Sequence, residues 1–285
     1  MNTGIETLAP ARTPAANGRR ITARIKFLVK GRGVETAFFS GAGLAVLLGL
    51  WWIGGFLIAT NPDTSSFAGF APGPAFAALG DILVGGGVWE MIGPSLYRIG
   101  TGLFWAVLVG VPTGIVIGRY ARLGRAAHTP FQFLRMISPL AWMPITILVF
   151  ETWDGAIVFL ISAAAVWPIV FATANGLRKI DPQWFKVARN LGGRELQVLR
   201  HVVLPAIAQD VLTGIRLALG ISWVVLVPAE YLGVTSGLGY GINDARDTLE
   251  YDRLAAIVVL IGAIGFVLDG LCLAAIKHFN WQQAD

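Results

Sequence analysis

Six apolar stretches, each long enough to cross a lipid bilayer as a helix, constrain the fold of this chain more than any other feature of its sequence. A membrane helix needs roughly 20 predominantly apolar residues, and the cost of unpaired backbone groups excludes open sheets from the hydrocarbon core. The predicted spans are residues 37–59, 97–118, 133–150, 156–175, 207–229 and 254–276. The sequence therefore predicts an all-α, polytopic membrane protein with six transmembrane helices in one domain over residues 34–280.

The composition supports a membrane protein. Hydrophobic residues make up 55% of the chain and charged residues only 14%, whereas soluble domains carry about 25% charged residues. The net charge of +5 comes from basic residues that flank apolar blocks, so it indicates membrane topology and no nucleic-acid partner. The single cysteine, Cys272, lies in an apolar run, and the three histidines are scattered, so no metal site is expected.

The distribution of lysine and arginine predicts the orientation. These residues are frequent before the first span, after the second and after the fourth, whereas residues 60–95 contain neither. Because cytoplasmic loops carry the excess of basic residues, both termini are expected on the cytoplasmic side of the membrane. Residues 1–33 are expected to form a disordered cytoplasmic tail, and residues 176–205 the longest cytoplasmic loop.

Two segments on the opposite side have recognisable patterns. Residues 75–84 place apolar side chains at helical spacing, which predicts a short helix at the outer interface. Residues 236–241 form a glycine-rich turn, but no lysine follows it as in a phosphate-binding loop. The sequence contains no P-loop motif, so we expect neither an ATPase site nor a cofactor on this chain.

The loop of residues 176–205 carries signals for a short helix. They are an N-cap residue, a proline at the first helical position and a pair of glycines at the end: Asp181, Pro182, Gly192 and Gly193. A second short helix is predicted over 194–203, and Pro205 is expected to open the fifth span. The pattern also fits an amphipathic hairpin that only covers the membrane surface. A DNA-binding helix-turn-helix fits poorly, because both ends are tethered to the membrane.

These residues resemble the EAA loop of the ABC importer permeases. The family pattern is Glu-Ala-Ala, three residues, Gly, nine residues and Ile-x-Leu-Pro. Four positions match at their spacings: Ala188, Gly192, Leu204 and Pro205. Val202 replaces the isoleucine, while Lys186 and Val187 depart from the leading Glu-Ala. The resemblance implies the type I ABC importer permease fold and a location in a bacterial inner membrane.

The resemblance also implies that this loop is a coupling helix, which docks into a groove of a cytoplasmic ABC ATPase. Aromatic anchors with basic residues at the rim suit such a contact. The residues expected to form the coupling site are Trp184, Phe185, Lys186, Ala188, Arg189, Gly192, Leu204 and Pro205. The family arrangement adds a second permease, here expected to form a homodimer, an ATPase dimer that binds the ATP, and an extracytoplasmic substrate-binding protein.

Further stretches, residues 138–144, 187–192 and 229–240, resemble the nitrate, sulfonate, taurine, cyanate and bicarbonate branch of these permeases. This resemblance implies import of a small anion such as nitrate, a sulfonate, taurine or cyanate. The residues expected to line the substrate pathway are Ser138, Trp142, Thr146, Arg216, Ser222 and Trp223.

Ionisable residues inside the spans are costly to bury and therefore indicate either pairing or function. Arg98 and Arg135 lie near the ends of predicted spans, where their side chains can reach the interface. Arg216 and Asp269 lie deeper, and Glu230 lies near the end of the fifth span. We predict interhelical pairs between Arg216 and Asp269 and between Arg98 and Glu230, while Arg216 is also a candidate for attracting an anion.

Two other functions stay open at this point. A secondary transporter driven by an ion gradient would need inverted repeats, which the sequence does not show, and a carboxylate near the bilayer centre, for which Asp269 is the candidate. A membrane enzyme would need acid–base or metal groups that converge at one depth, and the sequence shows none. The chain is therefore expected to be a transport subunit and not an enzyme.

Overall fold

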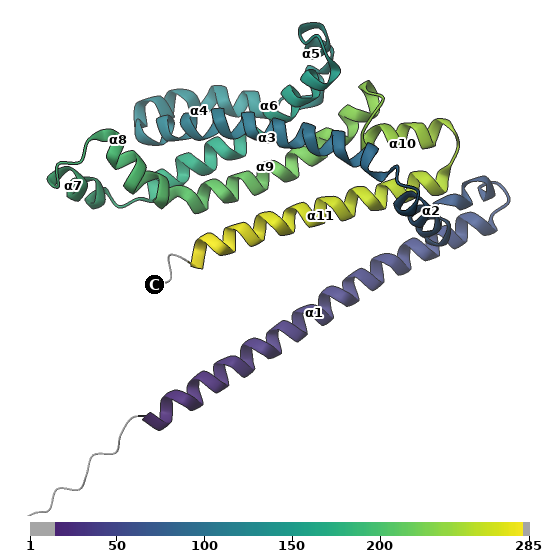
Figure 1. Ribbon diagram of the computed structural model, residues 1–285, viewed down its shortest axis with the longest axis horizontal. Coiled ribbons are helices and arrows are strands. Elements are labelled where there is room, and N and C mark those ends of the chain that lie inside the picture. Colours follow the sequence, from purple (N-terminus) through teal and green to yellow (C-terminus); the bar gives the residue numbers. More distant parts are fainter. Residues whose placement is uncertain (1–14, 282–285) are drawn as a thin grey trace, which may run out of the picture.

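The computed structural model describes the backbone of residues 15–281 and the side chains of Glu35 and of residues 38–278. Within that range every regular element is a helix, which confirms the all-α prediction (Figure 1). The elements are α1 (Ala15–Thr60), η1 (Ser65–Phe70), α2 (Pro72–Val84), α3 (Val88–Arg119), α4 (Ala121–Met136), η2 (Pro139–Trp142), α5 (Met143–Val149), α6 (Trp153–Lys179), α7 (Pro182–Asn190), α8 (Glu195–Val198), η3 (Leu199–Val203), α9 (Leu204–Gly233), α10 (Leu238–Asp247) and α11 (Tyr251–Trp281).

The described residues contain five single helices long and apolar enough to cross a membrane, and a sixth crossing only if a bent pair is counted as one span. That pair consists of α4 and the η2–α5 segment, which meet at an angle of 81°. The prediction of one span over 133–150 is therefore corrected to two helices. The break falls at Ile137 and Ser138, whose backbone is not helical. Ser138 precedes Pro139, and a residue before proline avoids the α region, while Pro139 itself has no N–H to donate.

The helices extend beyond the apolar stretches that predicted them. For example, α3 begins at Val88 instead of 97, and α6 ends at Lys179 instead of 175. Apolar length marks the bilayer crossing, whereas helical hydrogen bonding continues into polar residues. The first helix differs most: α1 includes residues 15–33, which the sequence assigned to a disordered tail, because arginine, lysine and alanine are good helix formers. Residues 1–14 of that predicted tail lie outside the described residues.

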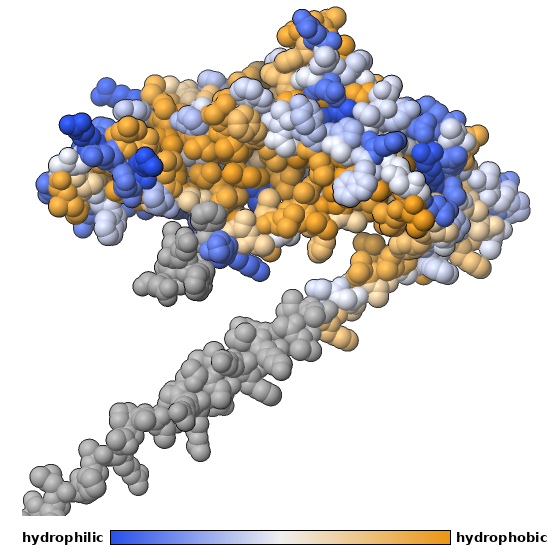
Figure 2. Space-filling model, viewed as in Figure 1, coloured by the Kyte–Doolittle hydropathy of each residue, from blue (hydrophilic) through white to orange (hydrophobic). Residues whose placement is uncertain are grey.

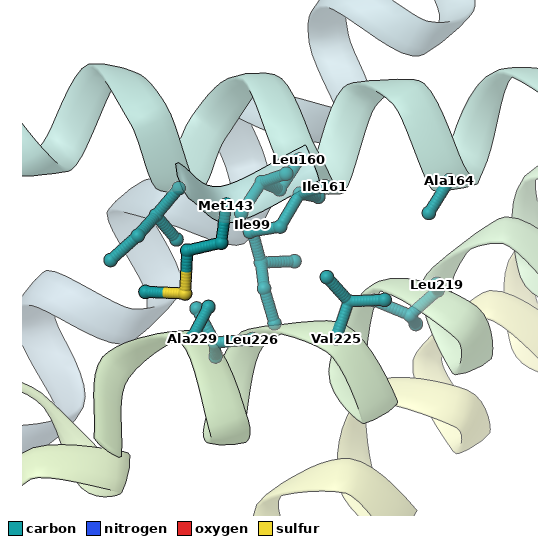
Figure 3. Packing of buried hydrophobic residues seen from close by; sticks show 10 residues of the cluster. Ile99, Met143, Leu160, Ile161, Ala164, Leu219, Val225, Leu226 and Ala229 are labelled. Carbon is teal, nitrogen blue, oxygen red and sulfur yellow. The ribbon is translucent and has the colours of Figure 1, made fainter. Parts of the chain in front are cut away.

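The central helix of the bundle is α6, which packs against α3 on one side and α9 on the other. Glycines of α3 make the first contact close: a Cβ at Gly102 or Gly114 would lie within 2.6 Å of a side chain of α6. Small residues at such contacts let membrane helices approach each other. A buried cluster from α3, α5, α6 and α9 fills the junction (Figure 3). Its labelled members are Ile99, Met143, Leu160, Ile161, Ala164, Leu219, Val225, Leu226 and Ala229.

The two ends of the bundle differ. The short helices α7 and α8 lie at one end, and α2 and α10 lie at the other (Figure 1). Between them the visible surface is largely hydrophobic, as Figure 2 shows. α2 confirms the short helix predicted over 75–84, whereas α10 was not predicted, since the sequence indicated only a turn there. α1 contacts mainly η1 and α2 and then diverges from the bundle (Figure 1).

Candidate functional site

The first candidate site is α7, whose beginning follows the sequence signals. The Asp181 side chain accepts a hydrogen bond from the backbone N–H of Gln183 at 2.8 Å. This bond satisfies one of the free N–H groups of the first turn. Pro182, which has no N–H, occupies the first helical position, as predicted.

The end of α7 is a Schellman motif, in which a glycine in the left-handed conformation reverses the chain. Gly192 has φ +78°. Its N–H bonds the carbonyl of Arg189, and the N–H of Gly193 bonds the carbonyl of Ala188, both at 2.9 Å. The predicted elbow at Gly192-Gly193 is confirmed.

α7 has one packed face and one exposed face. Phe185 and Ala188 pack against a buried cluster at the ends of α6 and α9. Its buried members are Leu177, Val198, Val203 and Ile207. On the other face Trp184, Val187 and Leu191 are exposed, at 62%, 49% and 83%. The sequence assigned Trp184 and Phe185 together to an aromatic anchor, but the fold separates them, and Phe185 is held within its own chain.

The remaining predicted coupling residues lie around this helix. Lys186 is exposed, and the exposed Arg189 forms an ion pair with Glu195 of α8 at 3.0 Å. Leu204 and Pro205 begin α9. The second predicted helix, 194–203, is not separate, because α8 continues through the π-helical η3 into α9. Pro205 cannot donate to the preceding turn, and the wider π-helical turn directly precedes it.

Two of the six predicted pathway residues, Trp142 and Trp223, pack against the same buried cluster but line different cavities. The buried hydroxyls of Thr146 and Ser222 donate to carbonyls of their own helices, at 2.9 and 2.8 Å. Ser138 is exposed at the break between α4 and α5. Trp142 lines a cavity of about 370 Å³, and Trp223 lines a separate one of about 130 Å³.

The sixth predicted residue, Arg216, is paired with Asp269 of α11. Its Nε lies 2.6 Å from Oδ1 and its Nη2 lies 2.7 Å from Oδ2 of that carboxylate. The predicted pair is confirmed, and its geometry is bidentate. Asp269 therefore neutralises the positive charge of Arg216, which was the candidate for attracting an anion. The same pairing occupies the Asp269 carboxylate, which was the candidate for an ion-gradient mechanism.

The second predicted pair, Arg98 with Glu230, is also confirmed and belongs to a larger buried network. Arg98 of α3 is 2% exposed and Glu230 of α9 is fully buried. The guanidinium lies 2.5 Å from the Glu230 carboxylate and 2.7 Å from that of Asp154 on α6. The Ser95 hydroxyl and the backbone N–H of Gly239 also donate to Glu230, at 2.8 and 3.0 Å. Each charge is therefore compensated, as burial requires.

The glycine-rich turn before α10 covers this network. Gly237 has φ +110°, and a Cβ there would lie 2.6 Å from the Glu230 carboxylate. A Cβ at Gly239 would lie 2.3 Å from the Val227 carbonyl oxygen. The glycines thus allow the chain to approach a buried acid, a role that the sequence did not indicate.

Comparisons with known proteins agree with this arrangement. The model of the family described as binding-protein-dependent transport system inner membrane component matches residues 110–277. The chain is 37% identical to the bicarbonate transport system permease protein CmpB of Synechococcus elongatus, with 79% of this chain and 86% of that protein covered. It is 34% identical to the nitrate import permease protein NrtB of Leptolyngbya laminosa, in an alignment that covers 65% of this chain and 66% of that protein. It is 31% identical to the taurine transport system permease protein TauC of Escherichia coli, in an alignment that covers 79% of this chain and 82% of that protein.

The fold is similar to that of a solved transporter. A chain of the inward-facing MetNI methionine ABC transporter aligns with a TM-score of 0.57 at 18% identity, covering 70% of this chain and 96% of that one. This likeness bears on the fold alone. The family match over residues 110–277 covers more than half of the sequence, and relatives such as CmpB agree with it. This chain therefore belongs to the family of binding-protein-dependent transport system inner membrane components, as a membrane-spanning ABC importer permease.

Proposed function

We propose that this permease forms the translocation pathway for a small anion delivered by an extracytoplasmic binding protein, and that α7 transmits the motion of a cytoplasmic ABC ATPase. The relatives are named for bicarbonate, nitrate and taurine. The anionic group of each of these solutes joins three oxygens to one central atom and carries one negative charge. A common pathway chemistry for such oxyanions supports nitrate, a sulfonate, taurine or bicarbonate as the cargo, with cyanate as a smaller alternative.

The observation that carries the coupling role is the division of α7 into two faces. Its exposed apolar stripe follows helical spacing, at Trp184, Val187 and Leu191, with Lys186 and Arg189 beside it. An exposed tryptophan bordered by basic residues is typical of an energetic centre in a protein interface. The opposite face of α7 packs on the ends of α6 and α9. A displacement of α7 would therefore move the helices that form the bundle.

The proposed assembly follows from this assignment. α7 contacts an ATPase dimer, which places α7 and both termini in the cytoplasm, with residues 34–280 as the permease domain after a cytoplasmic N-terminal segment. The binding protein docks at the opposite end, near α2 and α10. A second copy of the chain completes the pathway, because closed two-fold dimers are the commonest oligomers and α1 leaves most of its apolar surface uncovered.

Removing the exposed anchor tests the coupling role. We expect Trp184→Ala to weaken binding of the partner ABC ATPase by about 30-fold or more, since truncating an interface centre costs about 2 kcal/mol or more. Lys186→Glu should weaken it as well; Arg189 is less informative because of its pair with Glu195. The measurement is the affinity of the purified ATPase for the permease in nanodiscs.

A tryptophan of similar exposure supplies the control. Trp52 on α1 is 64% exposed, close to the 62% of Trp184, and Trp52→Ala should leave the affinity unchanged. Full ATPase binding by both Trp184→Ala and Lys186→Glu would refute the coupling assignment.

A further inference from the structure

The break between α4 and α5 borders the cavity of about 370 Å³ that Trp142 lines. Ala163, Trp167 and Pro168 of α6 and Ile221 of α9 form its other walls. These residues lie near the middle of α6, which runs from Trp153 to Lys179, and near the middle of α9. The cavity therefore lies at about half the depth of the bundle. Broken backbone at such a depth is tolerated in membranes only where protein buries it or a cavity adjoins it.

Arg135 is the single ionisable residue that lines this cavity. Within the described side chains it has no carboxylate partner and no hydrogen bond, and its guanidinium lies over the Phe171 ring at 5.5 Å. Arg98 and Arg216, by contrast, are each neutralised by acidic residues. Arg135 thus presents an uncompensated positive charge at the wall of an otherwise apolar space.

The structure also changes the expected position of Arg135 in the fold. The sequence placed it at the start of a span, where its side chain could reach the interface. However, α4 begins at Ala121 and ends at Met136, so Arg135 lies in the last turn of α4, directly before the break, about 21 Å along the helix axis from its start at 1.5 Å per residue. Its side chain is exposed on the single chain and lies against the cavity. An ionisable residue within a segment long and apolar enough to cross a membrane is a candidate for a functional site.

Two tryptophans add neutral donors to this charge. The indole N–H groups of Trp142 and Trp167, which both line the cavity, donate to no acceptor in the part of the chain that the structure describes. The lining residues therefore carry donors but no carboxylate. A site with this polarity favours an anion.

We propose that this cavity is an anion subsite of the translocation pathway, in which Arg135 pairs with the oxygens of a small oxyanion. The inference rests on the proposed function and adds a residue and a place to it. A guanidinium binds two oxygens on one atom at once, which nitrate, bicarbonate and a sulfonate group all offer. A lipid phosphate is the poorer occupant, since headgroups lie about 15 Å from the bilayer centre. One base in an apolar space keeps binding weak enough for release, as transport requires.

A cysteine probe tests the charge of the cavity without transport. The chain has one cysteine, so Cys272→Ser with Ala163→Cys places a single thiol in the cavity wall. The reagents are the anionic sulfonatoethyl methanethiosulfonate and its cationic trimethylammonium analogue, applied to the assembled transporter in nanodiscs with and without nucleotide. We expect Arg135→Gln to lower the anionic-to-cationic rate ratio about tenfold. Arg122→Gln, which changes an equally exposed arginine of the same helix that does not line the cavity, should leave the ratio unchanged. An unchanged ratio in Arg135→Gln, or a thiol that reacts with neither reagent in any state, would overturn the subsite.

Transport measurements separate the anion-subsite proposal from the proposed function as an anion importer. In proteoliposomes with its ATPase and binding protein, Arg135→Gln should lower uptake tenfold or more while assembly and basal ATP hydrolysis persist, and Arg135→Lys should retain part of the uptake. Equal uptake by wild type and Arg135→Gln overturns the subsite and leaves the anion importer intact. If wild type imports none of nitrate, bicarbonate and taurine but Arg135→Gln still lowers the rate ratio, the cargo proposal fails while the anion-selective cavity stands.

Discussion

At the scale of single residues, the chain retains buried charges only where other groups compensate them. Removing Arg98 from water is costly, and the attraction to Glu230 repays that cost only with good geometry and further hydrogen bonds. Ser95, which lies one turn before Arg98 on α3, supplies such a bond, as do Asp154 of α6 and the N–H of Gly239 at the start of α10. The network thus joins α3, α6, α9 and the first turn of α10.

Breaking this network should be far more damaging than breaking a surface pair. Arg98→Met leaves the fully buried Glu230 without its charge partner, and we expect a loss of about 3–5 kcal/mol in unfolding free energy. Adding Glu230→Met should recover part of that loss. Denaturant titration of the detergent-solubilised permease measures both.

The comparison for this experiment is Lys179→Met. Lys179 is 68% exposed and pairs with Asp210, and exposed pairs contribute about 0–1 kcal/mol. Equal unfolding midpoints for Arg98→Met and Lys179→Met would show that the buried network contributes no more than a surface pair.

At the scale of elements, α7 shows which features of a helix are local. Asp181, Pro182 and the two glycines fix its ends through contacts within a few residues, so the sequence predicted these ends correctly. Its faces are not local: Phe185 rests on Val203 and Ile207, which come later in the chain. For this reason the sequence assigned Trp184 and Phe185 to the same role.

The two glycines at the end of α7 should differ in their tolerance of a side chain. Gly192→Ala meets no atom within 4 Å but forces alanine to φ +78°, at a cost of about 1–2 kcal/mol. Gly193→Ala places its Cβ 2.7 Å from the Ala188 carbonyl oxygen, to which the Gly193 N–H bonds. We expect amide hydrogen exchange over 188–193 to rise with both and more with Gly193→Ala. Gly220→Ala, whose Cβ would lie in open space on α9, should leave hydrogen exchange over 188–193 unchanged. A greater rise in exchange with Gly192→Ala than with Gly193→Ala would contradict this account.

At the scale of the whole molecule, the helices differ in how much of their surface the chain itself covers. In the most apolar 18-residue segment of α6, 44% of the residues are buried within the chain, but in that of α1 after residue 37 only 6% are. α6 is therefore the core of the bundle, and α1 relies on lipid or on another chain to cover its apolar surface. This contrast supports a permease that functions within a larger assembly.

The orientation of the bundle is testable with single cysteines in the Cys272→Ser background. Thr235 and Gln183 are both exposed and lie near α10 and in α7 respectively. If α7 faces the cytoplasm, an impermeant maleimide should label Thr235→Cys in intact cells and Gln183→Cys only after lysis. The reverse pattern would place α7 outside and exclude contact with a cytoplasmic ATPase.

The sequence by itself determined the helical class, the regions that cross the membrane, the ends of α7 and the pairs Arg216–Asp269 and Arg98–Glu230. Transfer of a segment into lipid depends on its composition over about 20 residues. Helix capping depends on residues close in the sequence. Charges inside the membrane are few, so each has few possible partners. Only the tertiary structure decided the 81° bend of the third span, the position of Arg135 at a cavity beside that bend with no carboxylate partner among the described side chains, and the place of Gly237 against Glu230. These features depend on how helices distant in sequence pack against one another, and no short-range pattern encodes which faces meet.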